Sequence, residues 1–424
     1  MFDRPTVTTS TTRKAIRFLL FIAVSALLYY LLIGDLVPPA PRRMTMDDFE
    51  AAEMGLPSAP QSNGTRILIV SSMFPLAKSK HSKEDYAVWL KNFLAPITTD
   101  IYMYTTPDLV DMIKQFRGNL PITINSSYSS PFEVPPLRGL EKAYTRMNDV
   151  DKEKWHHSPG LYAVWNAKPF LLHSAVQFLE EQGKVYDYAF WNDGGSFRAE
   201  HRYTNWPDPG RVQQVWEEGS RLTGMEKENL LYFPLFETVD STFKDWQENM
   251  GPIANSGQVS EGSFFGGSPS TIAWFSKTFY AYHDYYLSQW LFVGIDQDIF
   301  NAIFLLFPER IFTVWMKDQK APKSPVHHGM TPSKIIPGLH LGYYNGECGD
   351  PWFYYQFWLS DRKTRDEMRK LWIEEAQWRR LRWWTERRMC QMKKAKSMMD
   401  ILKTSFGVDW KPPQRSLNIS SLFQ

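Results

Sequence analysis

The chain of 424 residues is long enough for one large domain or two ordinary ones, and 43% of its residues are hydrophobic and 15% aromatic. This composition predicts a substantial packed core and excludes an intrinsically disordered protein. A formal net charge of +2 gives no overall field to hold nucleic acid, so we expect no nucleic-acid partner. The two cysteines, Cys348 and Cys390, exclude a disulfide framework and a cysteine-rich zinc module but leave one bridge open.

The strongest single signal is an apolar run, FLLFIAVSALLYYLLI, over residues 18–33. At ~1.5 Å per residue it just spans the hydrocarbon core of a bilayer. Basic residues precede the run and acidic residues follow it, which predicts a cytosolic N-terminus and a lumenal main part. We therefore expect residues 1–17 to form a cytosolic tail and residues 18–34 the transmembrane signal anchor of a type II membrane protein. A cleaved signal peptide is the alternative.

Both interpretations send the chain into the secretory pathway, and we expect a single-pass protein of the Golgi or endoplasmic reticulum membrane. The short span favours an early compartment over the thicker plasma membrane. The acceptor pattern for N-glycosylation occurs at Asn63, Asn125 and Asn418. These matches are consistent with a lumenal glycoprotein, although three of them can also arise by chance.

Five prolines among small and acidic residues mark residues 35–63 as a stem that cannot bury a core. The globular part begins with RILIVSSMF at Arg66, a short β-branched run typical of a buried strand. A helix capped by Ser82 follows, and then a strand over residues 100–104 and a helix over residues 107–116. This alternation predicts an α/β domain with a mostly parallel central sheet.

The alternation continues along the chain. We expect a helix that has Pro169 in its first turn and a strand, YDYAFW, that ends at Trp191. Ser268 and Pro269 mark the start of a further helix, and RIFTVW forms the strand that follows the GIDQD helix. We assign residues 64–360 to this single α/β domain.

Residues 361–424 are basic and rich in tryptophan, and we expect them to form a helical extension. Leu371, Trp372 and Trp378 have the spacing of an amphipathic helix whose aromatic face packs on the domain. A surface that faces anionic lipid headgroups is the alternative.

Ligands of open α/β sheets bind beyond the carboxyl ends of the strands, so the turn after YDYAFW is the first candidate site. In this turn Asp193 is followed by Gly194 and Gly195. A carboxylate at this place suits a hard divalent cation that is held together with ligand phosphates. Turn chemistry alone also explains the sequence Asn-Asp-Gly-Gly.

Two further segments carry candidate residues. GSFFGG contains Gly266 and Gly267, which let a sugar or phosphate lie against the backbone, although such a bend is also common between elements. In GIDQD, Asp296 and Asp298 offer a base or an acceptor for sugar hydroxyls, with Gln297 between them. Asp296 is equally well placed to cap the following helix.

A glycine-rich loop contains His340 and Trp352. A neutral imidazole can complete a cation site begun by Asp193, and Trp352 can stack on a sugar, whereas a solvated loop histidine is the plainer explanation. Lys168 and Arg198 flank the ends of predicted elements at the binding edge, so we expect them to contact phosphate. The G-x-S-x-G, H-E-x-x-H, Walker and G-x-G-x-x-G patterns do not occur, which argues against the commonest hydrolase, zinc-protease, P-loop and dinucleotide-binding classes.

Taken in order, several segments resemble one known family, the bacterial HtrL/YibB proteins and their eukaryotic relatives. The segments are ILIVSSMF, KEDYAVWLKNFLAPITTDIYMYT, SPGLYAVWNAKPFLLHSAV, YDYAFWNDGGSFR, EGSFFGGSPSTIAWF and VGIDQDIFNAIF. That family is regarded as glycosyltransferase-like, of the GT-A type. The resemblance implies a GT-A domain, which has a Rossmann-like nucleotide-diphospho-sugar transferase fold. This domain would follow the N-terminal transmembrane helix in the chain.

The resemblance also implies a site. Asp193 takes the place of the GT-A metal motif, where a divalent cation, Mn²⁺ or Mg²⁺, bridges the diphosphate of a nucleotide-sugar donor, and His340 is the candidate for a further ligand. The paired glycines line the sugar pocket, and Asp296 or Asp298 binds sugar hydroxyls or acts as the base. The usual metal motif has two acids flanking one residue, whereas this turn has a single acid.

These residues predict a membrane-anchored lumenal glycosyltransferase that moves a sugar from a nucleotide-sugar donor to a glycan, protein or lipid acceptor. A catalytically silent GT-A-like module that binds glycans or scaffolds other enzymes is the alternative, and the missing second acid favours it. A hydrolase with paired carboxylates is a third hypothesis, because the sequence gives no distance between acids.

Overall fold

The computed structural model describes residues 64–76, 78–254, 259–316, 318, 348–378 and 392–419, without the side chains of residues 373–378. Its centre is an eight-stranded sheet with the order β3-β2-β1-β4-β6-β5-β7-β8. The strands are β1 (Ile67–Met73), β2 (Asp100–Thr105), β3 (Ile122–Asn125), β4 (Tyr188–Asn192), β5 (Leu231–Tyr232), β6 (Phe264–Gly267), β7 (Ile311–Val314) and β8 (Ala395–Ser397).

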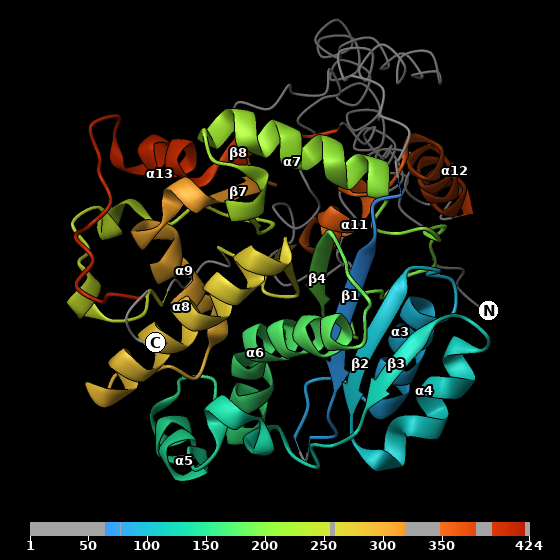
Figure 1. Ribbon diagram of the computed structural model, residues 1–424, viewed down its shortest axis with the longest axis horizontal. Coiled ribbons are helices and arrows are strands. Elements are labelled where there is room, and N and C mark those ends of the chain that lie inside the picture. The colour runs from blue at the N-terminus through green and yellow to red at the C-terminus, as the bar shows by residue number, and fades with distance from the viewer. Residues whose placement is uncertain are drawn as a thin grey trace, which may run out of the picture.

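Helices cover the sheet on both sides, with α3 and α4 behind β1 to β3 and α6 on the opposite side, against β1 and β4, in Figure 1. The helices are α3 (Lys83–Leu94), α4 (Val110–Arg117), α5 (Glu141–Val150), α6 (Pro159–Glu181), α7 (Pro209–Thr223), α8 (Pro269–Ser288), α9 (Asp296–Leu306), α11 (Tyr354–Trp358), α12 (Arg362–Trp378) and α13 (Met398–Phe406).

Most strands run in one direction. Strands β1 to β4 pair in parallel with one another, and β5 pairs in parallel with β7. Strand β6 runs opposite to β4 and β5, and β8 runs opposite to β7. The predicted α/β fold with a mostly parallel central sheet is therefore confirmed, with β6 and β8 as the antiparallel strands. The carboxyl ends of the other strands meet along one edge.

Alternate residues of the strands face two separate cores. Leu68 and Val70 of β1 lie in one core with α6, α8 and α9. Ile67 and Ile69 lie in the other with α3, α4 and α7. Side chains of a strand point alternately to its two faces, so a strand that is covered on both faces needs an apolar residue at every position. The short apolar run at the start of the globular part therefore specifies a central strand.

The order of the strands reverses at β1. From β1 the chain moves outward to β2 and β3, and it then returns past β1 to add β4 on the other side. Open α/β sheets bind their ligands at such a reversal, beyond the carboxyl ends of the strands. Asp193 follows the last residue of β4 directly.

Two predicted helix starts are confirmed. The Ser82 hydroxyl accepts a hydrogen bond from the Asp85 backbone at 3.0 Å, and the Asp85 carboxylate accepts one from the Ser82 backbone at 3.2 Å, which makes a capping box for α3. The Ser268 hydroxyl caps α8 through the Thr271 backbone N–H at 3.3 Å. Both caps are local patterns and could be recognised from the sequence.

One other predicted helix start was wrong, and the alternative role of Asp296 as a helix cap does not hold. Helix α6 begins at Pro159, after the cap Ser158, and Pro169 lies inside the helix. A serine before a proline is the stronger start signal, because the serine side chain satisfies a free backbone N–H of the first turn. Asp296 is the first residue of α9 and does not cap it, since the cap position belongs to Ile295. The Asp296 side chain is therefore available for contacts elsewhere.

The C-terminal segment contributes to the same sheet. Leu371 and Trp372 of α12 are buried, in agreement with the predicted amphipathic helix. Strand β8 pairs antiparallel with β7, so the segment predicted to be a helical extension also supplies an edge strand. Cys348 is disulfide-bonded, and the one other cysteine of the sequence, Cys390, lies outside the described residues.

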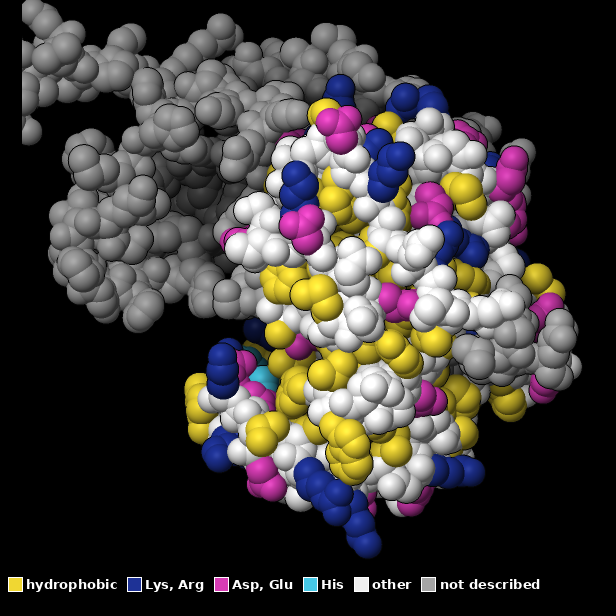
Figure 2. Space-filling view, turned by 90° about the vertical axis from the view of Figure 1, so that its left-hand side faces the viewer, with side chains coloured by type: hydrophobic (Ala, Val, Ile, Leu, Met, Phe, Trp, Pro, Cys, Tyr) yellow, Lys and Arg dark blue, Asp and Glu magenta, His cyan; other side chains and the backbone are white. Residues whose placement is uncertain are grey.

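Within the described part of the chain, no helix is both long and apolar enough to cross a bilayer. The predicted anchor at residues 18–34 and the stem at residues 35–63 lie outside that part. On the face drawn in Figure 2, basic and acidic side chains of the coloured residues are interspersed among apolar ones. Such a mixed surface agrees with the net charge of +2.

Candidate functional site

The candidate site begins in the Asn-Asp-Gly-Gly turn at the carboxyl end of β4. The Asp193 backbone N–H donates to the Ser263 carbonyl at 2.8 Å, which ties the turn to the start of β6. A Cβ atom on Gly194 would lie 3.4 Å from the Ser72 carbonyl, and one on Gly195 would lie 3.3 Å from a ring atom of a tyrosine on α3. The turn is therefore packed closely between β1, β6 and α3.

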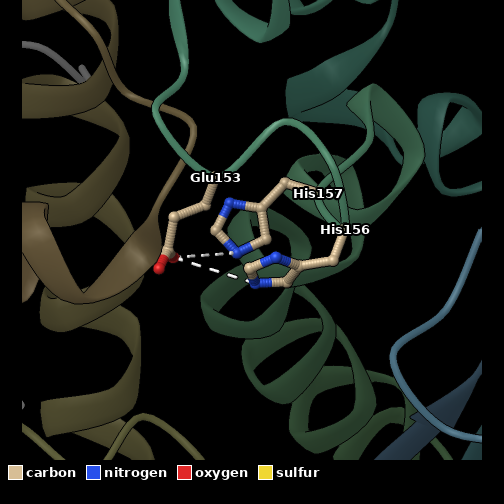
Figure 3. Close-up of side chains that lie close together, drawn as sticks. All are labelled: Glu153, His156 and His157. Carbon is tan, nitrogen blue, oxygen red and sulfur yellow. Dashed lines mark ion pairs between the residues drawn. The ribbon is translucent and has the colours of Figure 1, made fainter.

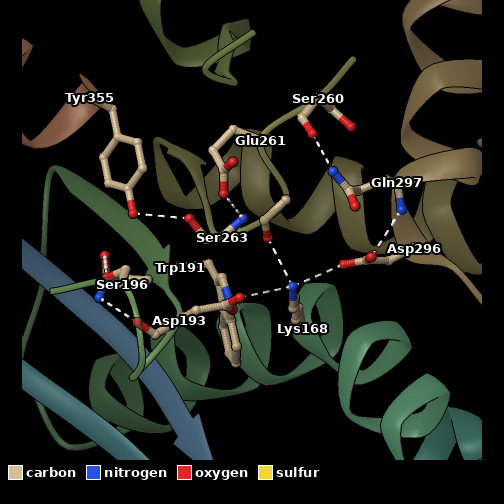
Figure 4. A network of polar contacts seen from close by, with 12 residues as sticks. Lys168, Trp191, Asp193, Ser196, Ser260, Glu261, Ser263, Asp296, Gln297 and Tyr355 are labelled. Atoms are coloured by element: carbon tan, nitrogen blue, oxygen red, sulfur yellow. Dashed lines mark hydrogen bonds and ion pairs between the residues drawn. The ribbon is translucent and has the colours of Figure 1, made fainter. Parts of the chain in front are cut away.

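The Asp193 carboxylate points away from its own turn, as Figure 4 shows. Its Oδ1 accepts a hydrogen bond from Trp191 Nε1 at 2.6 Å, and its Oδ2 lies 3.4 Å from Lys168 Nζ. The side chain is 34% exposed, so a ligand can reach it. Because the carboxylate contacts an indole and an ammonium group, turn chemistry alone does not account for Asp193.

Lys168 of α6 is the buried centre of the site. Its Nζ lies 3.1 Å from Asp296 Oδ2 and 3.4 Å from Asp193 Oδ2, and it donates to the Gly262 carbonyl at 2.9 Å. The residue is only 3% exposed. Burial by itself lowers the pKa of Lys168, but the charges of Asp193 and Asp296 outweigh this effect and raise it. Lys168 was predicted to contact phosphate, but its ammonium group is already paired with two carboxylates.

The acids around Lys168 outnumber the nearby cation. Burial raises the pKa of Asp296 to about 6 against the opposing charge of Lys168, and Asp193 adds to the rise. Glu261 is buried as well, and its Oε1 accepts a hydrogen bond from the Ser263 backbone at 3.0 Å. Burial raises the pKa of Glu261 well above its usual value. An anionic diphosphate therefore needs an additional cation to bind beside these carboxyl groups.

The other polar residues of GIDQD differ in their surroundings. Gln297 Nε2 donates to the Ser260 carbonyl, and its backbone N–H donates to Asp296 Oδ1 at 2.9 Å, so Gln297 ties α9 to the segment before β6. Burial, together with the charges of Asp296 and Asp151, raises the pKa of Asp298 to about 8. At pH 7 the Asp298 carboxyl is mostly protonated, and in this form it donates a proton and cannot act as a base.

Gly266 and Gly267 lie in β6, between its two neighbouring strands. A Cβ atom on Gly266 would lie 2.3 Å from the Ala189 carbonyl, and one on Gly267 would lie 2.7 Å from the Leu230 carbonyl. A side chain at either position would collide with the backbone of a neighbouring strand. Packing within the sheet therefore explains both glycines without the predicted sugar pocket.

Arg198 and Trp352 lie beside aromatic rings. The exposed Arg198 guanidinium lies 4.5 Å from the centre of the Trp89 ring and 5.1 Å from that of Phe353. Trp352 is half-buried, and its ring lies 5.3 Å from that of Phe236. Arg198 thus offers an exposed cation near the turn that carries Asp193, as phosphate binding requires.

A narrow crevice opens at the same edge of the sheet. Its walls include Glu261, Trp352 and Tyr355 and residues that follow β5 and β7. Tyr355 Oη lies 3.0 Å from Ser263 Oγ, which links the crevice to the polar network. The crevice is too narrow to admit a water molecule, and Glu261 and Tyr355 are buried, so of these three residues only Trp352 can meet a ligand. Sequence reasoning missed Glu261 and Tyr355, although Glu261 directly precedes the GSFFGG segment.

The described residues fit a divalent cation at Asp193 through one carboxylate only. Asp296, which also belongs to the charge network, is turned to Lys168 Nζ. His340, the predicted further ligand, lies outside the described residues. Mg²⁺ and similar cations often bind through one or two carboxylates plus substrate phosphates, so a single exposed carboxylate is sufficient for this type of site.

No protein-family model and no curated protein sequence matches the chain. Among solved structures, the chain is similar to mouse xyloside xylosyltransferase 1 in its apo form, with 9% identity, coverage of 58% of this chain and 83% of that chain, and a TM-score of 0.33. It is also similar to core-mannan synthase A from Aspergillus fumigatus in its Mn/GDP form, with 11% identity, coverage of 66% and 78%, and a TM-score of 0.35.

A third similar structure is 4-diphosphocytidyl-2C-methyl-D-erythritol synthase from Anaerococcus prevotii, with 11% identity, coverage of 60% of this chain and 88% of that chain, and a TM-score of 0.23. At these distances the likenesses do not assign the chain to a family. The resemblance to the HtrL/YibB proteins stays a prediction.

Replacement of Lys168 tests the charge network. We expect Lys168→Met to lower the free energy of unfolding by roughly 3–5 kcal/mol, because it leaves buried carboxyl groups without their cation. In the double variant Lys168→Met/Asp296→Asn, part of this loss should be recovered. Urea unfolding followed by circular dichroism measures both. Lys184→Met, at an exposed position, is the control, and an equal loss in the control would contradict the assignment.

Asp298→Asn tests the protonation of Asp298. The folded-state pKa of about 8 lies above the ordinary value of 3.8, so the protonated form contributes stability that is complete below the ordinary value and is lost as the pH rises through 8. The asparagine variant keeps a neutral side chain, and its Tm relative to the wild type should therefore rise from pH 4 to pH 8. Asp111→Asn, on an exposed surface of α4, should show no such trend.

Proposed function

We propose that the protein is a glycosyltransferase that moves a sugar from a nucleotide-sugar donor to a glycan, protein or lipid acceptor. The observation that carries the proposal is the arrangement of Asp193, Lys168 and Asp296 at the carboxyl edge of the parallel strands, beside an aromatic crevice. This edge is where α/β sheets bind nucleotides and related ligands. The resemblance of the sequence segments to a GT-A-type family supports the same reaction class.

Each residue has a defined part in the proposed reaction. Asp193 would hold a divalent cation, Mn²⁺ or Mg²⁺, and the ion would supply positive charge to offset that of the diphosphate. Lys168 and Trp191 fix the orientation of the Asp193 carboxylate through contacts at 3.4 and 2.6 Å. Asp296 is a positioning residue. Its carboxylate lies 3.1 Å from the ammonium group of Lys168 and holds that group beside Asp193. Arg198 contacts the phosphates from the exposed side.

In this proposal the sugar binds at the outer side of the crevice, against Trp352. Trp352 offers a ring that a ligand can reach, because it is only half-buried. Tyr355 and Glu261 are buried and support the site from inside.

We further infer that the protein is anchored in a membrane of the secretory pathway with its main part in the lumen. The apolar run at residues 18–33 supports the anchor. The disulfide bond of Cys348 supports an oxidising compartment, because such bonds rarely persist in the cytosol. Asn418 is exposed, as a glycan acceptor must be, whereas Asn125 is half-buried and its Oδ1 and Nδ2 both form hydrogen bonds.

One observation favours a catalytically silent glycan-binding module as the second candidate. Among the described residues near Asp193, Asp296 is engaged by Lys168, and burial raises the pKa of Glu261 and so disfavours its charged form, which leaves Asp193 without a ready second carboxylate. The silent module and the enzyme differ in turnover, so a single assay separates them.

Nucleotide release from a panel of sugar nucleotides is the decisive assay. The purified protein should release nucleotide in the presence of Mn²⁺ and lose this activity with a chelator. Asp193→Ala should lower turnover about a hundredfold, the size typical for loss of a charge-stabilising group at the reacting centre. Glu181→Ala removes an exposed acid at the end of α6, at the opposite edge of the sheet, and should leave turnover unchanged. Glycan binding without turnover would support the silent module instead.

The lumenal location predicts glycan attachment. Expressed in eukaryotic cells, the protein should resist carbonate extraction from membranes and shift in electrophoresis after treatment with an N-glycosidase. Asn418→Gln should remove part of this shift, because Asn418 is exposed, and Asn125→Gln should leave the shift unchanged. A protein that is extracted by carbonate and unaffected by the glycosidase would exclude the proposed topology.

A further inference from the structure

A second group of polar side chains lies in the segment between α5 and α6. Glu153 Oε2 lies 3.8 Å from His156 Nε2 and 3.5 Å from His157 Nε2. Figure 3 shows the carboxylate directed at both imidazole rings. One ligand atom from each of the three residues lies within 4.8 Å of the others. We propose that Glu153, His156 and His157 bind a divalent transition metal of the zinc class.

The local backbone brings the three side chains to one side of the segment. The backbone N–H groups of His156 and His157 both donate to the Glu153 carbonyl at 3.0 Å. The Glu153 N–H donates to Asp151 Oδ1 at 2.7 Å, which fixes the start of this turn. A single tight turn therefore presents all three ligands, and no distant element is needed to complete the set.

Asp151 orients one of the two imidazoles. Its Oδ2 lies 2.7 Å from His157 Nδ1 and accepts a further hydrogen bond from the Tyr162 hydroxyl. The side chains of Asp151 and His157 are each 7% exposed, so the pair is held inside the protein. A carboxylate on one ring nitrogen leaves the other for a metal, and metal-binding histidines almost always have such a partner. The contact therefore prepares His157 Nε2 as a ligand.

The spacing and the charges suit a tetrahedral ion. Ligand atoms at the usual bond lengths of ~2.0–2.1 Å from zinc lie ~3.4 Å apart in a tetrahedron. The observed separations of 3.5 and 3.8 Å from the carboxylate oxygen are close to this value. Glu153 and Asp151 together carry the charge that balances a divalent cation. Imidazole and carboxylate ligands favour Zn²⁺ and its neighbours over Mg²⁺ or Ca²⁺, which prefer oxygen alone.

The exposure of the ligands allows an ion to enter. The Glu153 side chain is 59% exposed, whereas those of His156 and His157 are 14% and 7% exposed. A bound ion would thus lie at the surface, with the imidazoles behind it and the carboxylate as its outer ligand. Two histidines and one glutamate also leave a fourth position of a tetrahedral ion for water or another ligand.

The position of the site links it to the helix that carries Lys168. Ser158, the cap of α6, follows His157 directly, and Tyr162, in the first turns of α6, bonds to Asp151. A bound ion would fix the beginning of α6 relative to the preceding segment. This metal site is separate from the one proposed at Asp193, and its occupancy does not depend on glycosyl transfer.

Metal analysis of the full-length protein tests the proposal. After treatment with a chelator, dialysis against Zn²⁺ and removal of excess ion, the wild type should retain a single zinc per chain. His157→Ala and Glu153→Gln should each lose it. Asp151→Asn should weaken binding by about 10–100-fold, because the orientation of His157 is lost while the ligands remain. Loading with Co²⁺ should give the strong visible absorption of a four-coordinate ion in the wild type and not in His157→Ala or Glu153→Gln.

Matched variants separate this site from other effects. Glu141→Gln changes an exposed glutamate on α5, and Asp193→Ala changes the proposed donor site; both should retain zinc as the wild type does. Because Glu153 is mostly exposed, Glu153→Gln should fold normally, which circular dichroism checks. A wild type that retains no zinc above the dialysis buffer, or a Glu153→Gln variant that binds as tightly as the wild type, would overturn the proposal.

Discussion

The buried ammonium group of Lys168 is the contact on which the arrangement of the site depends. A charge that is removed from water costs several kcal/mol unless it is paired, so α6 is stable in its place only with Asp193 and Asp296 beside it. These partners come from the turn after β4 and from the start of α9. These contacts fix α6, α9 and the turn after β4 relative to one another. They also fix the orientation of the partly exposed Asp193 carboxylate.

Much of the fold could be predicted because its signals are local. The alternation of short apolar runs and amphipathic helices identified β1, β2, β4 and β7, and the caps Ser82 and Ser268 marked two helix starts. The prediction for the start of α6 was wrong because it took Pro169 as a first-turn proline and passed over the Ser158–Pro159 pair, which begins the helix. The antiparallel direction of β6 is set by pairing across the sheet, which no single segment reveals.

The members of the site could be named individually, but their pairing could not. Asp193, Lys168 and Asp296 were each candidates for chemistry, yet the interpretation of Asp296 as a helix cap and of Lys168 as a phosphate contact treated them separately. Their ion pairs arise only when α6, α9 and the turn after β4 meet. Glu261 and Tyr355 were missed for the same reason, since their importance comes from burial, which depends on tertiary packing.

The edge strand β8 bears on how the chain reaches its native state. It pairs with β7, which without it would present an unpaired row of backbone groups at the end of the sheet. Residues 395–397 are synthesised long after residues 311–314, so β8 pairs with β7 late in folding. During that interval an apolar strand edge is open to wrong partners. Chaperone capture in the compartment where the chain folds should therefore centre on β7, and chains that stop before β8 should aggregate.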